Sequence, residues 1–254
     1  MFSHRKLLLL AAVLLGVAPL RAAVDADTCI KDALAAEARF DARTALKLFL
    51  QADAARPNDP VILQKISKQY SDATTDTTDV EEKKQLCIKA LAYARRAVDL
   101  NPRSAVNLLS LAICYGKLGL YSDTRTKIEY SRHVKEYAEQ ALALDPDYDY
   151  AHHVLGRWNY EVASLGFGTR VIVRVIYGGL PAASTAEAVR QLQRATELSP
   201  HLPAHRVELG FALLADGRRD AARQTFEQAL AMPQVEKYDS ESFRRAREAL
   251  ADLK

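Results

Sequence analysis

The sequence predicts an all-α protein built as a solenoid of stacked helix pairs. The composition favours helices over sheets, because alanine and leucine dominate, aromatic residues make up only 7% of the 254 residues, and there are ten glycines. One short phrase also recurs along the chain, consisting of an alanine, three further residues and a stop that contains proline. Such recurrence indicates that one supersecondary unit is repeated.

Each recurring phrase marks the end of a helix. The phrases "ADAARP", "AVDLNP", "ALALDP" and "ATELSP" end at Pro57, Pro102, Pro146 and Pro200, and "ALAMP" ends one residue early at Pro233. Proline cannot continue a helix and disfavours the helical conformation in the residue before it, so each phrase closes an amphipathic helix. A new helix is predicted to begin three residues beyond each proline.

Small residues recur at fixed offsets from these prolines. The eighth position of each first helix holds Ser67, Ala112, Gly156 or Gly210, and the second helices carry Ala52, Ala97, Ala141, Ala195 and Ala229. Small side chains allow neighbouring helices to approach closely. Together with the closing proline they form the signature of the tetratricopeptide repeat. The predicted fold is therefore a tetratricopeptide-like, right-handed α-solenoid of about five helix pairs.

The repeats are longer than the plain unit. Successive prolines lie 45, 44 and 54 residues apart, against about 34 for the plain repeat. The surplus falls between the two helices of repeats two, three and four. In repeat two it is a polar loop, in which Thr78 or Asp79 can cap a long helix. In repeat three it lengthens the second helix, and a final helix near 240–253 is expected to cap the exposed end.

The surplus in repeat four is the apolar segment "LGFGTRVIVRVIYGGLP". Val171, Ile172, Val175 and Ile176 form a stripe with helical spacing, beside Arg170 and Arg174. We predict a short amphipathic helix with hinges at 166–168 and 178–181, since a solenoid offers no sheet for a β-branched strand to join. The stripe is expected to cover the neighbours of repeat four or the groove, with both arginines directed to solvent or to an anionic partner.

The N-terminus has the pattern of an export signal. Arg5 and Lys6 precede fourteen mostly apolar residues, a run shorter than the roughly 20 residues that span a bilayer. Small residues follow, so residues 1–26 are predicted to be a signal peptide cleaved between 22 and 26. Residues 27–254 then form one domain without a membrane span, exported to the periplasm or secreted. An uncleaved N-terminal membrane anchor is the alternative.

The three cysteines show no metal-binding or redox spacing. Cys29, Cys87 and Cys114 form neither a CxxC pair nor a zinc pattern. Buried thiols are the favoured interpretation. In an antiparallel pair turning at Pro102, Cys87 and Cys114 lie within about one helical turn of each other, so a bridge between them stays open.

The stretch "AHHVLGRWNYEVASLG" resembles an active site, with two histidines, an arginine and the single tryptophan. His152 and His153 are about 100° apart on a helix and cannot share one metal ion. Counting through the repeats places nine residues on the concave face, where a groove could bind a ligand: Gln64, Lys68, Ile113, Lys117, Tyr150, His153, Arg157, Tyr160 and Phe211. The alternative is that the inserted segments fold into this groove and cover them.

No motif for catalysis appears along the chain. There is no GxSxG, phosphate-binding glycine loop, HExxH or pair of carboxylates on one face, so we predict no catalytic residue, metal or cofactor. The net charge of +3 does not call for nucleic acid. The expected function is a non-enzymatic scaffold whose groove binds a protein or peptide segment. A groove that binds or transfers a lipid or acyl chain is the alternative.

Three stretches resemble one known family. "HHVLGRWNYEVASLG", "LPAASTAEAV" and "ALAMPQVEKYDSESFRRAREALADLK" are similar to the regulator of microtubule dynamics family, and the resemblance covers roughly 89–254. It implies a helical tetratricopeptide-like domain, without enzymatic activity, that associates with microtubules or organelle contacts through protein or lipid binding. The export signal departs from this picture and suggests an exported homologue of bacterial type.

Overall fold

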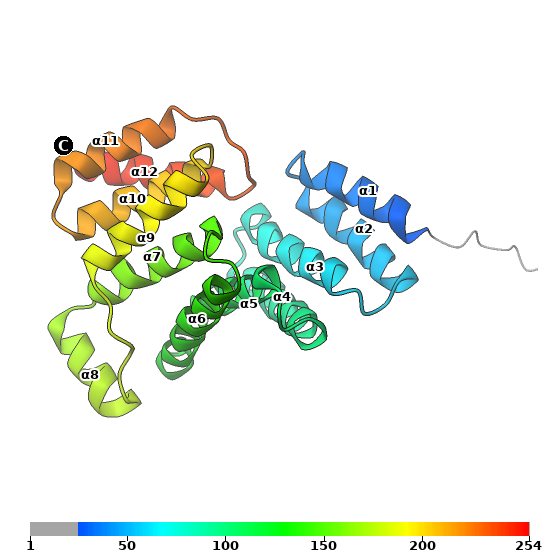
Figure 1. Cartoon of the computed structure of the whole chain (residues 1–254), viewed down its shortest axis with the longest axis horizontal. Coiled ribbons are helices and arrows are strands. Elements are labelled where there is room, and N and C mark those ends of the chain that lie inside the picture. Colours follow the sequence, from blue (N-terminus) through cyan, green and yellow to red (C-terminus); the bar gives the residue numbers. More distant parts are fainter. Residues whose placement is uncertain (1–24, 254) are drawn as a thin grey trace, which may run out of the picture.

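The computed structural model describes residues 25–253, and this part of the chain is entirely helical (Figure 1). The predicted signal peptide falls almost wholly on residues 1–24, outside the described residues. The helices are α1 (Ala26–Glu37), α2 (Ala42–Ala55), α3 (Pro60–Ala73), the 3-10 helix η1 (Thr74–Asp76), α4 (Val80–Leu100), α5 (Ala105–Gly119), α6 (Thr124–Leu144), α7 (Asp149–Ala163), α8 (Phe167–Tyr177), α9 (Thr185–Leu198), α10 (Pro203–Ala215), α11 (Arg219–Leu230) and α12 (Asp239–Asp252).

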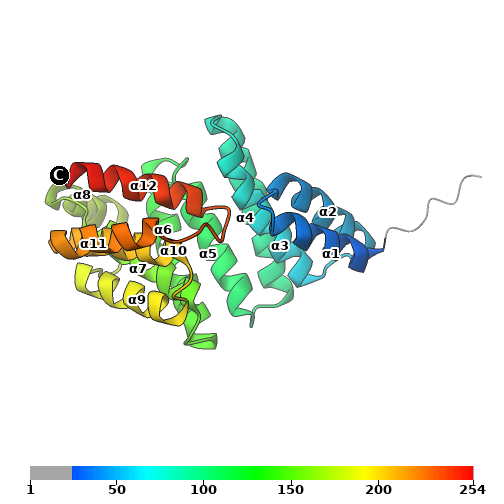
Figure 2. The same cartoon turned by 90° about the horizontal axis from the view of Figure 1, so that it is seen from above.

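The helices stack as five pairs. The pairs are α1 with α2, α3 with α4, α5 with α6, α7 with α9, and α10 with α11. Figure 2 shows them following one another along the long axis, with α12 lying on the last pair. This arrangement confirms the predicted all-α solenoid of five helix pairs, including the lengthened α4 and α6 and the final helix near 240–253.

The helix boundaries follow from the prolines and from capping side chains. Helices α3, α5, α7 and α10 each begin three residues after a proline of the recurring phrase, as predicted. Asp79 is the cap that starts α4, since its carboxylate accepts a hydrogen bond of 2.8 Å from the backbone N–H of Glu82. The polar insertion of repeat two therefore forms one 3-10 turn after α3, and the chain then continues as the long helix α4.

The small residues hold the pairs together. Every alanine predicted at the closing position of a second helix is fully buried. Gly156 and Gly210 are needed because the partner helix packs directly on their backbone. A Cβ atom built on Gly156 would lie 2.4 Å from Cγ of Leu192, and one on Gly210 would lie 2.5 Å from Cε1 of Phe226.

All three cysteines are buried free thiols. Cys87 and Cys114 lie in the same core cluster without a bridge between them. Burial raises the pKa of Cys87 to about 11, and burial also raises the pKa of Cys114. Both thiols therefore stay protonated near neutral pH and behave as small apolar side chains.

The inserted segment of repeat four forms the predicted helix but does not cover its neighbours. Helix α8 ends at Gly178, whose φ of 75° closes it in the left-handed conformation. Val173 is buried, whereas the stripe of Val171, Ile172, Val175 and Ile176 is exposed. The expected burial of the stripe was wrong, because α8 rests on α6 through the opposite face.

Among the helices of residues 25–253, none is both long and apolar enough to cross a membrane.

Candidate functional site

The inner face of the solenoid is formed by the first helices of the pairs. Helices α3, α5, α7 and α10 contact one another in succession. The loop of residues 231–238, between α11 and α12, extends from the last repeat toward the first repeats (Figures 1 and 2). We call this loop the strap.

The strap joins the two ends of the solenoid. Lys237 donates a hydrogen bond of 2.9 Å to the carbonyl oxygen of Phe40, in the turn between α1 and α2, and also pairs with Asp76 in η1. Lys237 and Phe40 are 197 positions apart in the sequence. The last repeat is thereby held to the first two across the inner face.

Central inner-face residues also contact the strap. The ammonium group of Lys117 lies 5.5 Å from the ring centre of Tyr238, a cation–π contact. Burial raises the pKa of Tyr150, and the nearby carboxylate of Glu236 raises it further. Asp239 shapes the turn into α12, because its side chain accepts two hydrogen bonds of 2.8 Å from the backbone of residues 235 and 236.

A cavity of about 130 Å³ lies between the strap and the first two repeats. Lys68 lines it and forms ion pairs with Glu37 at 2.9 Å and with Asp72 at 2.7 Å. Burial disfavours the ammonium ion, but the carboxylates of Asp72 and Glu37 outweigh it and raise the pKa of Lys68. Gln69 also lines the cavity, is 1% exposed, and its Nε2 has no hydrogen-bond partner among the described residues.

The other predicted residues of α3 and α5 tie these helices together. Gln64 donates a hydrogen bond of 2.8 Å to the hydroxyl of Ser110, and Lys117 donates one of 2.8 Å to the carbonyl oxygen of Ser71. Ile113 packs against the core shared by α5, α6 and α7. Ile113 therefore contributes packing to the inner face, and the polar residues around it already have partners.

Two predicted residues of α7 belong to a partly buried chain of side chains around His205, which is itself fully buried. Nδ1 of His153 lies 2.9 Å from Nδ1 of His205 in α10, whose Nε2 lies 3.1 Å from the carboxylate of Asp149. The ring of Tyr150 packs edge-on against His205, with 5.1 Å between ring centres. Burial opposes ionisation of Asp149, but the bond from His205 outweighs it and lowers the pKa to about 2.

Glu208 is the centre of a second buried network. Its side chain is 1% exposed, accepts a hydrogen bond from the hydroxyl of Tyr160, and pairs with Arg245 of α12 and, at 3.6 Å, with Arg157. Burial opposes its charge, but Arg157 and Arg245 outweigh burial and lower its pKa to about 2. Arg245 also lies over the ring of Phe211 at 4.5 Å. Two of the nine predicted residues, Arg157 and Tyr160, thus meet at one carboxylate, and a third, Phe211, packs under its partner Arg245.

The basic and aromatic members of these networks are predicted by the sequence, whereas the acidic members are not. Glu208, Asp149, Glu37 and Asp72 are not among the nine residues predicted for the groove, and they pair with the basic side chains there. Glu208 could have been predicted from the sequence, because it is the one carboxylate in the otherwise apolar run of α10 after Arg206. A lone carboxylate in such a run requires buried partners.

Lowering the pH from 7 to 5 is expected to destabilise the protein through His153. Burial lowers the pKa of His153 to about 3, against 6.5 for an unperturbed histidine. Between these two pKa values the unfolded chain binds a proton that the folded chain excludes. The free energy of unfolding is therefore unaffected by His153 above about pH 6.5 and decreases as the pH falls toward 3. The melting temperature should decrease across this range, and His153→Gln should flatten the decrease.

His201→Gln is the matched control for this pH series, because His201 is exposed on the turn before α10. Glu208 and Asp149 also have low pKa values, but protonation of these carboxylates lowers the free energy of unfolding only at more acidic pH, below about 4.5. An unchanged pH slope in His153→Gln would contradict the assignment to His153.

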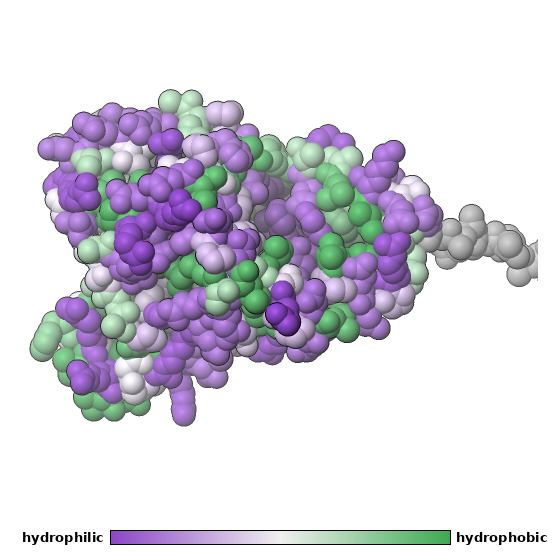
Figure 3. All heavy atoms as spheres, in the orientation of Figure 1, coloured by the Kyte–Doolittle hydropathy of each residue, from purple (hydrophilic) through white to green (hydrophobic). Residues whose placement is uncertain are grey.

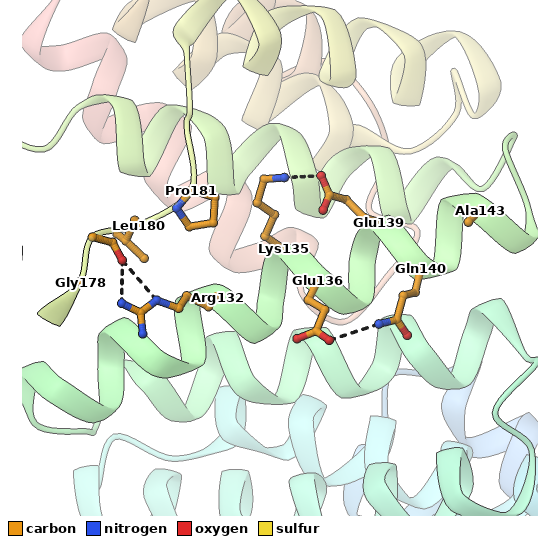
Figure 4. Close-up of a pocket in the computed structure, with 10 residues that line it drawn as sticks. Arg132, Lys135, Glu136, Glu139, Gln140, Ala143, Gly178, Leu180 and Pro181 are labelled. Atoms are coloured by element: carbon orange, nitrogen blue, oxygen red, sulfur yellow. Dashed lines mark hydrogen bonds and ion pairs between the residues drawn. The ribbon is translucent and has the colours of Figure 1, made fainter. Parts of the chain in front are cut away.

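A larger recess lies outside the inner face, along α6. Its volume is about 700 Å³, and it is lined by ten residues: Arg132, Lys135, Glu136, Glu139, Gln140, Ala143, Gly178, Gly179, Leu180 and Pro181 (Figure 4). Lys135 pairs with Glu139, and Gln140 donates a hydrogen bond of 3.3 Å to Glu136. Since these side chains already bond one another, the recess offers few free polar groups to a ligand.

Residues 25–253 contain no group of three or more His, Cys, Asp or Glu side chains that could hold a metal ion. His152 and His153 have separate partners, since Nδ1 of His152 lies 2.5 Å from the side-chain oxygen of Gln191 on α9.

The sequence matches a known family over most of its length. The family described as Regulator of microtubule dynamics protein 1-3 matches residues 30–254. Regulator of microtubule dynamics protein 1 of Bos taurus is 33% identical over 144 residues, which cover 56% of this chain and 45% of the bovine protein. Protein 3 of Xenopus laevis is 29% identical over 181 residues, which cover 71% and 39% of the two chains. The aligned part is less than half of each relative.

Solved structures share the fold at low sequence identity. A thermophilic tetratricopeptide-repeat protein of Thermus thermophilus has a TM-score of 0.64 and 21% identity, covering 89% of this chain and all of that one. A pilF protein of Pseudomonas aeruginosa has a TM-score of 0.53 and 13% identity, covering 90% and 88%. These similarities confirm the tetratricopeptide-type solenoid that the sequence predicted.

Proposed function

The chain belongs to the family of regulator of microtubule dynamics proteins 1-3, and from this premise we propose that it is a non-enzymatic scaffold. Its inner face binds an extended segment of a partner protein, in the place that the strap takes in the isolated chain. A tetratricopeptide fold is suited to this role, because its stacked helices present a long surface to another chain.

The observation that carries the proposal is the strap itself. It is a non-helical stretch between two helices, and it contacts Lys117 and Tyr150 of the inner face and the backbone of Phe40 in the turn between α1 and α2. A surface that holds one non-helical segment by side-chain and main-chain contacts has the chemistry to hold another. The strap and a partner segment would then compete for the same contacts.

The contacts of the strap define the chemistry of the partner. Tyr238 meets a lysine, and Glu236 lies beside a buried tyrosine, so the partner segment should carry an aromatic and an acidic side chain near each other. A main-chain carbonyl oxygen would complete the site by accepting a hydrogen bond from Nε2 of Gln69, which lacks one.

The paired charges of the inner face favour a peptide over an acyl chain. Lys68 and Glu37 lie around the cavity beside the strap. An acyl chain placed there would desolvate these charged groups without bonding to them, and that is costly. Native mass spectrometry of the purified protein distinguishes the two, since a bound lipid would add its mass.

We also propose a cellular setting for the protein. The relatives are named for microtubule dynamics, and an association of this chain with microtubules or organelle contacts rests on that name. Export by the N-terminal segment rests on the sequence pattern alone. In an exported bacterial protein the partner would be a periplasmic or secreted protein.

Replacing residues 233–238 of the strap with glycine and serine, so that Tyr238 is removed as well, is expected to open the inner face. A fluorescent peptide with the sequence of residues 231–239 should then bind the variant in trans, and its anisotropy should increase on titration. The intact protein should bind it much more weakly, because its own strap holds the same contacts at high effective concentration.

Lys117→Ala in the strap-replaced protein is the companion variant. It should weaken peptide binding through loss of the contact with the aromatic ring of Tyr238. Lys127→Ala on α6 is the matched control, because Lys127 is exposed and takes no part in these contacts. Peptide binding that is absent, or that is equal in both lysine variants, would refute the inner face as the binding surface.

A further inference from the structure

Helix α8 leaves its apolar face uncovered. Five of its side chains expose large fractions of their surface: Phe167 78%, Val171 44%, Ile172 53%, Val175 78% and Ile176 65%. Figure 3 shows the hydrophobic surface of this helix at the edge of the molecule, away from the stacked repeats. Scattered apolar residues are common on surfaces, but a contiguous set on one short helix marks an interaction site.

The exposed residues share one side of the helix. At about 100° per residue, positions 167, 171, 175, 172 and 176 spread over about half of the helix circumference. Val173 lies on the opposite side and is the buried residue of α8. The face that docks on α6 and the apolar face are therefore opposed, so the apolar side chains point away from the protein body.

The helix is held firmly in this orientation. Arg132 of α6 donates hydrogen bonds to the carbonyl oxygens of Tyr177 and Gly179, the latter at 3.2 Å from its Nε. These bonds satisfy main-chain acceptors at the C-terminal end of α8, where helical partners are missing. The apolar face is thus presented by a fixed element of the fold.

Both charged side chains of α8 itself are positive. Arg170 and Arg174 lie on successive turns along one edge of the apolar face, and both are exposed. Neither has an ion-pair partner within 4.0 Å among the described residues. From residue 162 to residue 186 the sequence contains no aspartate or glutamate. A surface that covers this helix should therefore be apolar in its depth and anionic at its rim.

We propose that α8 docks the protein on an anionic lipid bilayer, lying in the plane of the interface. A helix of 11 residues is about 16 Å long, roughly half the thickness of the hydrocarbon core, so it cannot span the membrane. An exposed apolar face bordered by arginines is the pattern of an interfacial helix, in which the apolar side chains enter the acyl region and the arginines reach the phosphates. A second copy of the chain fits less well, because it would bring the same positive edge to the contact.

Sedimentation with lipid vesicles tests this assignment. The full chain should bind phosphatidylcholine vesicles that contain phosphatidylglycerol, bind pure phosphatidylcholine vesicles more weakly, and be released by salt. Val175→Glu should reduce binding to the anionic vesicles by about tenfold or more, since it places a charge in the apolar face. Arg170→Gln with Arg174→Gln should remove most of the preference for anionic lipid.

Val61→Glu is the matched control. Val61 is 66% exposed at the start of α3, so this variant changes the net charge by the same amount without touching α8. Both glutamate variants should keep the melting temperature of the parent protein, because both positions are solvent-exposed.

Phe167→Trp provides a direct readout, because its emission should shift to the blue on binding vesicles, while Trp158 is buried and gives a constant background. The proposal would be overturned by any of three results: no binding to anionic vesicles, equal loss of binding in Val175→Glu and Val61→Glu, or light scattering that shows a dimer dispersed by Val175→Glu.

Discussion

Replacing Glu208 with alanine is expected to lower the free energy of unfolding by about 3–5 kcal/mol, the cost of leaving buried cations without their partner. Glu208 is 1% exposed and is the common partner of Arg157, Arg245 and the hydroxyl of Tyr160. The variant keeps both guanidinium groups near the core and removes the carboxylate that balances them. Because Arg245 is on α12, the last helix should also detach more readily.

Urea denaturation followed by circular dichroism measures this effect. Glu161→Ala is the matched control, since Glu161 pairs with the same Arg157 at 2.8 Å but its side chain is 52% exposed. An exposed pair of this kind is worth about 0.3–0.5 kcal/mol. Equal destabilisation by the two variants would show that Glu208 acts as one more surface charge, contrary to its position in the structure.

Placing a valine at Gly156 is expected to cost roughly 3 kcal/mol or more, because α7 and α9 would have to separate. Even a Cβ atom would lie 2.4 Å from Cγ of Leu192 and 3.2 Å from the carbonyl oxygen of Ala188. Leu192 is fully buried, so it cannot turn outward into solvent without moving its neighbours. The melting temperature should fall by several degrees.

A pair of alanine variants isolates this contact from helix propensity. Gly156→Ala should destabilise the protein, although alanine favours a helix by up to about 1 kcal/mol over glycine. Gly116→Ala should be neutral or stabilising, because its nearest neighbour would be a methyl group of Val134 at 3.5 Å. If both variants raised the melting temperature, the close approach of α7 and α9 would not be a requirement of the fold.

The local sequence determined the helices and their order. The proline of each recurring phrase determined where α3, α5, α7 and α10 begin, and the buried alanines and glycines determined which faces of the helices meet. These features depend on a few neighbouring residues, through backbone geometry and the spacing of side chains along a helix. For the same reason the segment 167–177 could be identified as an amphipathic helix.

The tertiary structure alone decided which distant side chains meet. The contact of Lys237 with Phe40 depends on how five pairs curve in space, and the pairing of Glu208 with Arg245 depends on how α12 packs on α10. No local pattern encodes either arrangement. The same reason explains α8: its sequence specified an apolar stripe, but whether a neighbour covers it depends on the direction in which the helix leaves the solenoid. Small rotations at each packed pair add up along the chain, so the curvature, and with it the position of the strap, is a property of the whole stack.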